Sequence, residues 1–248
     1  MAELLLQAQG ITVRFGGLTA VDAVSADFHA GELVGIIGPN GAGKTTFFNA
    51  ISGVIAPTSG QLIAGGRNLS GKGPHRYAAA GIARTFQTPR VFPDMQVSAN
   101  IGFGLKFAGR RREGAWHLRS EESILELIGL GAQAALPAAA ITPSQQRLLE
   151  IGMALATRPR MLLLDEVAAG LTEAEIESMA QLIRRMRDEL GMTVVWIEHA
   201  VTTLLRHVER VIVLHQGRVI ADGTPAGVVR DAGVIEAYLG DEMVEKAL

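Results

Sequence analysis

A glycine-rich segment, GPNGAGKTT, contains residue types that can bind phosphate. It matches the pattern G-x-x-x-x-G-K-[ST], and it follows the strand-like run ELVGII and precedes a helix-like run. Glycines let backbone N–H groups turn toward phosphate oxygens, and the start of a helix adds positive potential. In such a loop Lys44 can bridge the β- and γ-phosphates, and Thr45 can offer its hydroxyl to Mg²⁺. The predicted phosphate-binding residues are Gly38, Pro39, Asn40, Gly41, Ala42, Gly43, Lys44, Thr45 and Thr46.

Two acidic residues, Asp165 and Glu166, directly follow the apolar run MLLL. In open α/β sheets, ligands bind beside the carboxyl ends of the strands. We therefore expect Asp165 to hold Mg²⁺ through water, and Glu166 to polarise the water that attacks the γ-phosphate. An isolated acidic pair can instead cap the next helix, but the phosphate loop in the same chain favours the catalytic interpretation.

A histidine, His199, ends the strand-like run TVVWIEH in the same way. An imidazole at this position could reach the γ-phosphate and respond to its presence. A single histidine is more often structural than functional. The phosphate loop and the acidic pair together favour a catalytic role for His199.

Short β-like runs alternate with helical stretches along the chain, and several of the runs are apolar throughout. This pattern predicts a mostly parallel sheet covered by helices. The strand candidates are ITVRF, ELVGIIG, GIARTF, MLLLDE, TVVWIEH and RVIVLH, the last followed by a hairpin turn at Gln216 and Gly217. Helices are predicted over 44–51, 144–157, 173–190 and 200–207, with the third ending at Gly191.

Two further regions differ from this alternation. Residues 10–35 and 59–70 have short alternating runs broken by Gly, Asn and Ser, which predicts a small antiparallel sheet. Between about residues 89 and 140 the composition changes to Gly, Ala and Arg, with helical spacing in SEESILELIGL. This segment is expected to be an inserted helical subdomain.

In this order the motifs resemble those of the ATP-binding-cassette (ABC) ATPases, over nearly the whole chain. The resemblance implies one α/β domain over residues 1–248, with a P-loop NTPase (RecA-like) core, a small antiparallel β subdomain and an inserted α-helical subdomain. It places the nucleotide-binding core in 1–88 and 158–248, and the helical subdomain in about 89–157. ATP and Mg²⁺ are the implied ligands.

Two more residues match motifs of that family. Phe15 lies 29 residues before Lys44, at the family's adenine-stacking aromatic, and Gln87 in RTFQ matches its glutamine loop. Taken alone, Phe15 would be assigned to the core and Gln87 to the surface. The resemblance implies that Phe15 stacks on the base, and that Gln87 touches Mg²⁺ and transmits the nucleotide state to a membrane partner.

The family's signature, usually L-S-x-G-Q, aligns with ITPSQ at Ile141 to Gln145. The resemblance implies that Thr142, Ser144 and Gln145 contact ATP bound to a second ATPase subunit. Ser144 replaces a glycine whose backbone passes close to phosphate, and Pro143 stiffens the loop. Two further departures are Val167, for the usual proline, and Thr172, for the usual aspartate.

Longer segments narrow the resemblance to the ATPases of branched-chain amino-acid importers, and specifically to the longer of the two ATPase subunits. They are GLTAVDAVSADF, RTFQTPRVFPDMQVSANI, DEVAAGL and GTPAGVVRDAGVIEAYLG. Related importers of urea, amides or aromatic compounds share this pattern, so the solute stays open.

The implied partners are a second ABC ATPase subunit in a heterodimer, two transmembrane permease subunits and, indirectly, a solute-binding protein. The expected location is the cytoplasmic face of the cell membrane. The net charge of −2 argues against nucleic acid as a partner. The apolar runs are strand-sized, far short of the roughly 18–20 residues of a membrane span, so a membrane role requires a partner.

Two alternatives remain at this point. One is a soluble, non-transport ABC ATPase of DNA repair, translation or cluster assembly, although the chain has one cassette and no long coiled-coil insertion. The other is an interaction module that binds nucleotide but hydrolyses it poorly because of the altered signature. Fractionation with membrane subunits tests the first, and an ATPase assay with the partner ATPase tests the second.

Overall fold

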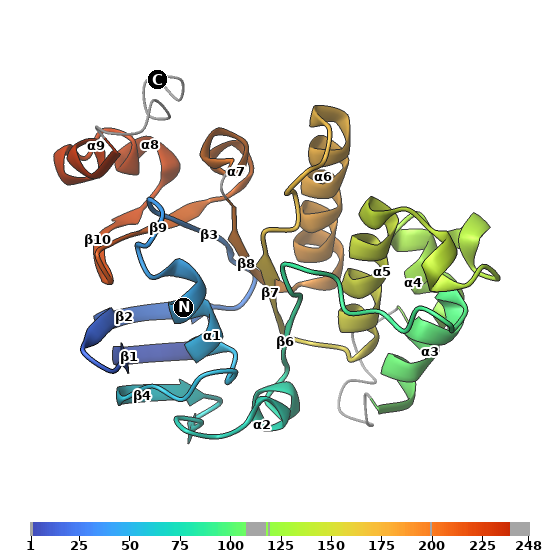
Figure 1. The fold of residues 1–248 in the computed structure, drawn as a ribbon, viewed down its shortest axis with the longest axis horizontal. Helices are drawn as coiled ribbons and strands as arrows, with labels where there is room; N and C mark the ends of the chain where they lie inside the picture. The colour runs from blue at the N-terminus through green and yellow to red at the C-terminus, as the bar shows by residue number, and fades with distance from the viewer. Residues whose placement is uncertain (1, 108–117, 119, 199, 239–248) are drawn as a thin grey trace.

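The computed structural model describes residues 2–107, 118, 120–198 and 200–238. Its larger sheet has the strand order β10-β9-β3-β8-β7-β6, shown in Figure 1. The strands are β3 (Leu33–Ile37), β6 (Ile82–Arg84), β7 (Met161–Asp165), β8 (Thr193–Ile197), β9 (Arg210–His215) and β10 (Arg218–Gly223). The pairs from β9 to β6 are parallel, and β9 and β10 form the predicted antiparallel hairpin. The predicted parallel core is therefore confirmed.

A second sheet is antiparallel, with the strand order β2-β1-β4-β5. Its strands are β1 (Leu4–Phe15), β2 (Leu18–His29), β4 (Ser59–Ala64) and β5 (Arg67–Asn68). The predicted antiparallel sheet is confirmed with different limits. It begins at Leu4, since the side chains of LLLQAQ already contribute to its buried face, and residues 33–35 belong to the parallel sheet instead.

Helices pack on the parallel sheet, and a further group of helices lies to one side of it (Figure 1). The helices around the core are α1 (Lys44–Ile51), α2 (Pro74–Ala79), α6 (Glu173–Leu190), α7 (Val201–His207), α8 (Pro225–Val228) and α9 (Ala232–Tyr238). A helical layer, defined as α3 (Val97–Phe107), α4 (Glu121–Leu127) and α5 (Pro143–Ala156), lies beyond the β6 side of the sheet. As predicted, α6 ends at Gly191, whose φ is 62°.

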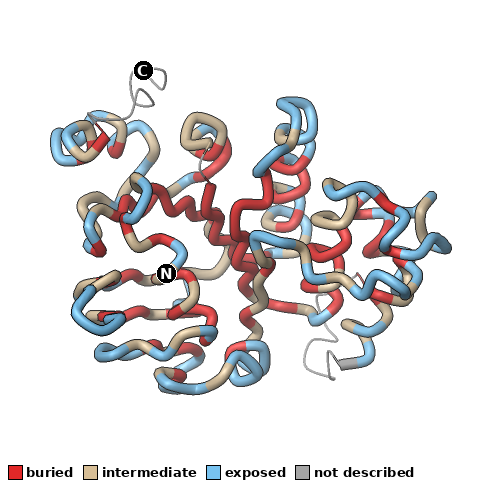
Figure 2. Tube along the Cα trace, viewed as in Figure 1, coloured by how far each residue is buried: buried red, intermediate tan, exposed pale blue. Residues whose placement is uncertain are grey.

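The core strands are buried on both faces, which explains their continuous apolar runs. Every residue of β3, β7 and β8 is buried, and Figure 2 shows this buried band crossing the middle of the molecule. Successive side chains of β7 point to opposite faces. Leu162 and Leu164 pack in the cluster that includes the helical layer, whereas Met161 and Leu163 pack with Phe47 and the antiparallel sheet.

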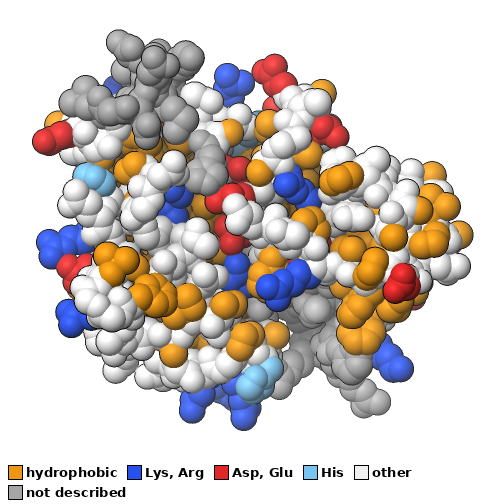
Figure 3. Space-filling view, in the orientation of Figure 1, with side chains coloured by type: hydrophobic (Ala, Val, Ile, Leu, Met, Phe, Trp, Pro, Cys, Tyr) orange, Lys and Arg blue, Asp and Glu red, His pale blue; other side chains and the backbone are white. Residues whose placement is uncertain are grey.

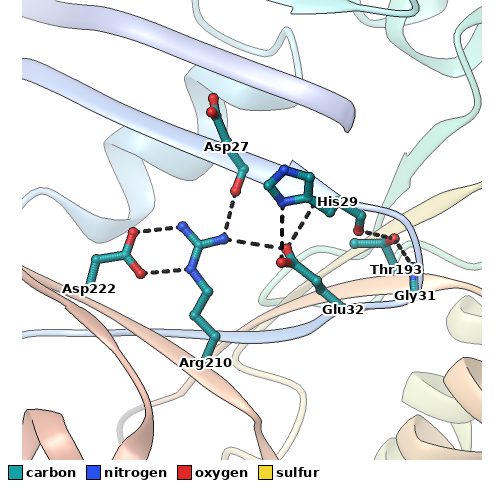
Figure 4. Close-up of polar contacts among 7 residues, drawn as sticks. All are labelled: Asp27, His29, Gly31, Glu32, Thr193, Arg210 and Asp222. Atoms are coloured by element: carbon teal, nitrogen blue, oxygen red, sulfur yellow. Dashed lines mark hydrogen bonds and ion pairs between the residues drawn. The ribbon is translucent and has the colours of Figure 1, made fainter. Parts of the chain in front are cut away.

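A network of polar contacts joins the two sheets (Figure 4). Arg210 on β9 donates two hydrogen bonds to Asp222 on β10, at 2.7 and 2.6 Å, and one to the carbonyl oxygen of Asp27 on β2, at 2.7 Å. Its guanidinium also lies 3.4 Å from Glu32, which accepts a hydrogen bond from the backbone N–H of His29. Thr193 on β8 also bonds to the carbonyl oxygen of His29, at 2.7 Å, so Arg210 and Thr193 both hold the antiparallel sheet against the parallel core.

Within the described ranges, none of the helices has both the length and the apolar character needed to cross a membrane.

Candidate active site

The glycine-rich segment forms the loop between β3 and α1, where it was predicted. Gly38 has a φ of 152°, and a Cβ there would lie 2.0 Å from the carbonyl oxygen of Leu214. Gly43, which precedes α1, has a φ of 96°, and a Cβ there would lie 2.4 Å from the carbonyl oxygen of Ala20. Both positions therefore require glycine, and the loop is closely packed against the neighbouring backbone.

Lys44 lies in the first turn of α1 and is 6% exposed. Its Nζ donates hydrogen bonds to the carbonyl oxygens of Gly38, at 2.6 Å, and Pro39, at 3.1 Å. Burial lowers the pKa of Lys44, while the negative charge of Glu166 raises it. The ammonium group is thus held inside the loop, in the position from which it can face phosphate oxygens.

An open pocket of about 630 Å³ lies over this loop. Residues 40–46 and Glu166 form its polar end. Phe15 and Leu18, on the hairpin between β1 and β2, form an apolar wall and are 50% and 66% exposed. Exposed apolar side chains beside a cavity are typical of a ligand site. The pocket therefore has separate places for a flat apolar group and for phosphates.

Asp165 and Glu166 lie at the carboxyl end of β7, as predicted. Glu166 has a φ of 51°, a left-handed backbone conformation that is uncommon for a residue with a side chain and is often found at functional sites. The side-chain amide Nε2 of Gln87 donates a hydrogen bond of 2.6 Å to Oε2 of Glu166. The structure thus brings Gln87 and Glu166 together at the pocket.

Arg84 is a residue of this site that the sequence analysis did not single out. Its Nη2 lies 2.9 Å from Oδ2 of Asp165, and its Nη1 donates to Asn49 and Ser52 at the end of α1. Burial lowers the pKa of Arg84, and the charge of Asp165 raises it. Arg84 stands in RTFQ beside the predicted Gln87, but Asp165 lies 81 residues away, so only the fold reveals the ion pair.

The turn between β9 and β10 also contributes to the pocket. Gln216 and Gly217 line it, together with Thr19 and Ala20 of the antiparallel sheet. The backbone N–H of Gly217 donates to the carbonyl oxygen of Ala42, at 3.0 Å. The sequence predicted the turn, but no local signal indicated that it packs on the phosphate loop.

The signature residues lie away from this pocket. Thr142 caps the amino end of α5, Pro143 begins the helix, and the side chain of Gln145 returns to the backbone N–H of Thr142, at 3.0 Å. The hydroxyl groups of Thr142 and Ser144 are 3.0 Å apart. These residues line a different pocket of about 610 Å³, which also includes Glu175. Within one chain, the signature and the phosphate loop do not meet.

His199 lies outside the described residues. The strand that leads to it is present as β8, and Ile197 at its end is paired with Asp165. The intervening Glu198 is buried and accepts hydrogen bonds from Trp196, at 3.0 Å, and from the backbone N–H of Ala168, at 2.7 Å.

The side chains at the phosphate pocket are suited to a magnesium ion. No group of three or more His, Cys, Asp or Glu that could hold a metal by itself occurs among the described residues. Mg²⁺ usually has fewer protein ligands than that, combining one or two carboxylates with waters and substrate phosphates. Asp165, Thr45 and Gln87 offer carboxylate, hydroxyl and amide oxygens, the hard ligands that this ion prefers.

Charged side chains mark this region of the surface. In the space-filling view of Figure 3, acidic side chains lie near the centre of the visible face with Lys and Arg side chains close by, and hydrophobic side chains gather both over the helical layer and over the antiparallel sheet.

Comparisons with known proteins agree with this geometry. Residues 21–169 match the model of the ABC transporter family. The chain is 37% identical to the high-affinity branched-chain amino acid transport ATP-binding protein BraF of Pseudomonas aeruginosa, over 97% of this chain and 100% of that protein. It is 36% identical to the corresponding protein LivG of Escherichia coli K12, again over 97% and 100%.

The chain belongs to the ABC transporter family. Among solved structures, it is similar to an ATP-binding cassette of an ABC transporter in its ADP conformation, with a TM-score of 0.83, 30% identity, and coverage of 96% of this chain and 99% of that one. A nucleotide-free ATP-binding cassette gives a TM-score of 0.80 at 28% identity, over 96% and 100%.

These findings confirm two predictions. The fold is that of a P-loop NTPase with a parallel core and a small antiparallel sheet. The chain is an ATP-binding and ATP-hydrolysing subunit of an ABC transporter.

Proposed function

We propose that this ABC ATPase energises an importer of branched-chain or other hydrophobic amino acids. One observation carries the choice of solute. Residues 218–244 match a separate model described as the branched-chain amino acid ATP-binding cassette transporter. The names of BraF and LivG, which this chain resembles over nearly its whole length, point to the same class of solute.

In the proposed site the phosphate loop holds the triphosphate, from Gly38 to Thr46. Lys44 faces the β- and γ-phosphates, and the exposed ring of Phe15 stacks on the adenine at the apolar wall of the pocket. Thr45, Asp165 and Gln87 would hold Mg²⁺, which when bound offsets the charge of the phosphates.

Glu166 is the proposed general base. It takes a proton from the attacking water as the water oxygen bonds to the γ-phosphorus, and the bond from that phosphorus to the oxygen of ADP breaks, which gives ADP and phosphate. The hydrogen bond from Gln87 to Glu166 supports this role, because it links the glutamine loop to the same carboxylate. We assign His199, which follows β8 in the sequence, to contact with the γ-phosphate.

A second ABC ATPase subunit completes the proposed site. The separation of the two motifs within one chain supports a head-to-tail pair, since the signature residues Thr142, Ser144 and Gln145 line a different pocket from the phosphate loop. ATP would lie between the phosphate loop of one subunit and the signature of the other. The nucleotide-binding core would then consist of residues 1–88 and 158–248, and the helical signature subdomain of about 89–157.

Two transmembrane permease subunits are the proposed membrane partners. The ATPase would be bound to them at the cytoplasmic face of the membrane, with a solute-binding protein acting only on the permeases. Closing and opening of the ATPase pair would then move the permeases.

Uptake measurements test the proposed solute. Deleting the gene should abolish uptake of radiolabelled leucine, isoleucine and valine, and the wild-type gene should restore it while a Glu166→Gln gene should not. Unchanged uptake of all three amino acids after deletion would contradict the choice of solute. Co-purification with two membrane proteins tests the permease partners independently, since a non-transport ATPase would purify without them.

A further inference from the structure

Glu150 is a buried acidic residue that does not line the ATP pocket. It lies on α5, is 6% exposed, and uses both carboxylate oxygens as acceptors. Oε2 accepts the backbone N–H of Phe86 at 3.3 Å, and Oε1 accepts the backbone N–H of Arg90 at 2.9 Å. One side chain of α5 therefore holds both ends of the segment 86–90, which carries Gln87.

The attachment of the chain changes at Phe86. Up to Thr85 the chain belongs to the core, since the N–H of Thr85 donates to the carbonyl oxygen of Leu163 at 2.9 Å, and its Oγ1 accepts from the N–H of Asp165 at 3.3 Å. From Phe86 to Arg90 the bonds to Glu150 run to α5 instead. The segment that follows β6 is thus fastened to the helical layer.

Neighbouring side chains support this attachment. The guanidinium of Arg90 lies 3.9 Å from the centroid of the Phe86 ring, and that of Arg84 lies 4.6 Å from it, both within the range of cation–π contact. Burial raises the pKa of Glu150, while the N–H groups of Arg90 and Phe86 and the charges of Arg90 and Arg84 lower it. A carboxylate removed from water needs such compensation, and the segment 86–90 together with Arg84 supplies part of it.

The segment 86–90 is bound to α5 through Glu150 and also contacts Glu166, the proposed general base. Gln87 stands between the two residues that Glu150 holds, and its amide is 2.6 Å from Glu166. A movement of α5 relative to the core would therefore carry Gln87 toward or away from Glu166. The signature residues Thr142 and Ser144 lie at the start of the same helix.

We propose that Glu150 is a positioning residue that makes the segment 86–90 follow α5, so that the helical layer sets the distance between Gln87 and Glu166. The step from Gln87 to catalysis rests on the proposed role of Glu166. Through this connection, the binding of ATP against the signature of one subunit would change the position of Gln87 beside Glu166, the general base of that same subunit.

Glu150→Gln tests the proposal with almost no change in volume. An amide oxygen can accept one of the two N–H groups, but the amide nitrogen is a donor and cannot accept the other. The chain contains no cysteine, so Thr88→Cys and Glu122→Cys, both at exposed positions, can be spin-labelled specifically. Glu126→Gln, an exposed change on α4 of the helical layer, is the matched control.

In the parent protein and in the Glu126→Gln control, the distance distribution between the labels at 88 and 122 should be narrow, and the same with and without ATP. In Glu150→Gln it should broaden. ATP affinity should stay within about twofold, while turnover falls by about tenfold, within the cost of up to about 10²-fold that displacing a positioned group can have. An unchanged distribution, or unchanged turnover despite a broadened one, would overturn the proposal.

A second pair of variants serves if Glu150→Gln does not fold. Arg90→Pro and Arg90→Ala both remove the guanidinium, but only proline also removes the N–H that donates to Glu150. We expect the label at position 88 to be more mobile, and turnover to be lower, in Arg90→Pro than in Arg90→Ala. Equal label mobility and equal turnover in the two variants would overturn the proposal. If Glu166 is not the general base, turnover in Glu166→Gln will be unchanged. The distances between the labels then still decide whether Glu150 holds the segment 86–90.

Discussion

Glu166 combines a left-handed backbone with a hydrogen bond to Gln87, which fixes its carboxylate at the end of β7. Glu166→Gln keeps the size of the side chain but removes the ability to take a proton. We expect ATP binding to persist while turnover falls by at least about 10²-fold, the contribution typical of a general base. Phosphate release and equilibrium binding of ATP measure the two effects, with Glu173→Gln in the first turn of α6 as the control. Normal turnover together with normal binding would remove Glu166 from this role.

Lys44 makes its contacts from inside the phosphate loop, and a replacement by alanine leaves no other ammonium group in its place. Lys44→Ala should weaken ATP binding by about tenfold to a hundredfold, since hydrogen bonds to charged groups contribute about 1.5–3 kcal/mol each. Titration with a fluorescent ATP analogue measures the change. Binding as tight as that of the wild type would show that Lys44 does not face the phosphates.

Phe15 is half exposed at the apolar wall of the pocket, which differs from the burial expected of a core phenylalanine. Phe15→Ala should weaken ATP and ADP binding equally, by a few-fold, because stacking of one base on an aromatic ring is worth at least about 1 kcal/mol. Phe92→Ala, at another exposed phenylalanine that is absent from the pocket lining, is the control. If both affinities stayed unchanged in Phe15→Ala, the stacking assignment would be wrong.

Between elements, Arg210 makes one of the polar contacts that join the two sheets. Arg210→Met retains much of the aliphatic length but loses the bonds to Asp222 and to the carbonyl oxygen of Asp27. We expect the free energy of unfolding to fall by about 1.5–3 kcal/mol, the range for hydrogen bonds to charged groups. Thermal unfolding should show a melting temperature lower by several degrees, at about 2–4 °C per kcal/mol for a chain of this size. Arg185→Met, in an exposed pair with Glu189 on α6, should leave it nearly unchanged.

The elements that the sequence predicted well are those whose signals are local. The apolar runs of β3, β7 and β8, the glycine loop and the stop of α6 at Gly191 each depend on neighbouring residues, and all are present. Contacts between distant residues left no such signal. Arg84 meets Asp165, and Glu150 meets the segment 86–90, only because the sheet order and the packing of α5 bring them together.

At the scale of the whole molecule, the phosphate loop and the signature open into different pockets, so two chains are needed to enclose one ATP in the proposed arrangement. The signature of this chain would then serve the ATP of its partner. The signature departs from the family pattern at Ser144, whereas the phosphate loop, Gln87, Asp165 and Glu166 match it; the other two departures, Val167 and Thr172, follow the acidic pair. A defect in the signature would therefore slow the partner's site and spare this one.

The structure gives a physical reason to expect this asymmetry. Ser144 adds a side chain where the family has glycine, and Pro143 fixes the first turn of α5. Glu175 lines the same pocket as the signature, and hydrogen bonds from Thr172 and Ser144 lower its pKa. Its negative charge would repel a phosphate bound there. Losing a well-placed donor to the transition state typically costs about 3–4 kcal/mol, enough to silence one of two sites. The opposing consideration is that serine at the start of a helix can itself bind phosphate.

Co-purified ATPase subunits allow the two sites to be tested one at a time. Glu166→Gln in this chain should abolish nearly all turnover of the pair, whereas the equivalent change in the partner should have little effect. Ser144→Gly, which restores the glycine of the family pattern, should raise turnover by activating the partner's site. Ser59→Gly, an exposed change on β4 that lines neither pocket, is the control. Equal losses from the two glutamine variants, with no gain from Ser144→Gly, would mean that both sites hydrolyse ATP and that the altered signature is competent. In a chain that also carries Glu166→Gln, this chain's own site is inactive, so a gain from Ser144→Gly measured in that background comes from the partner's site.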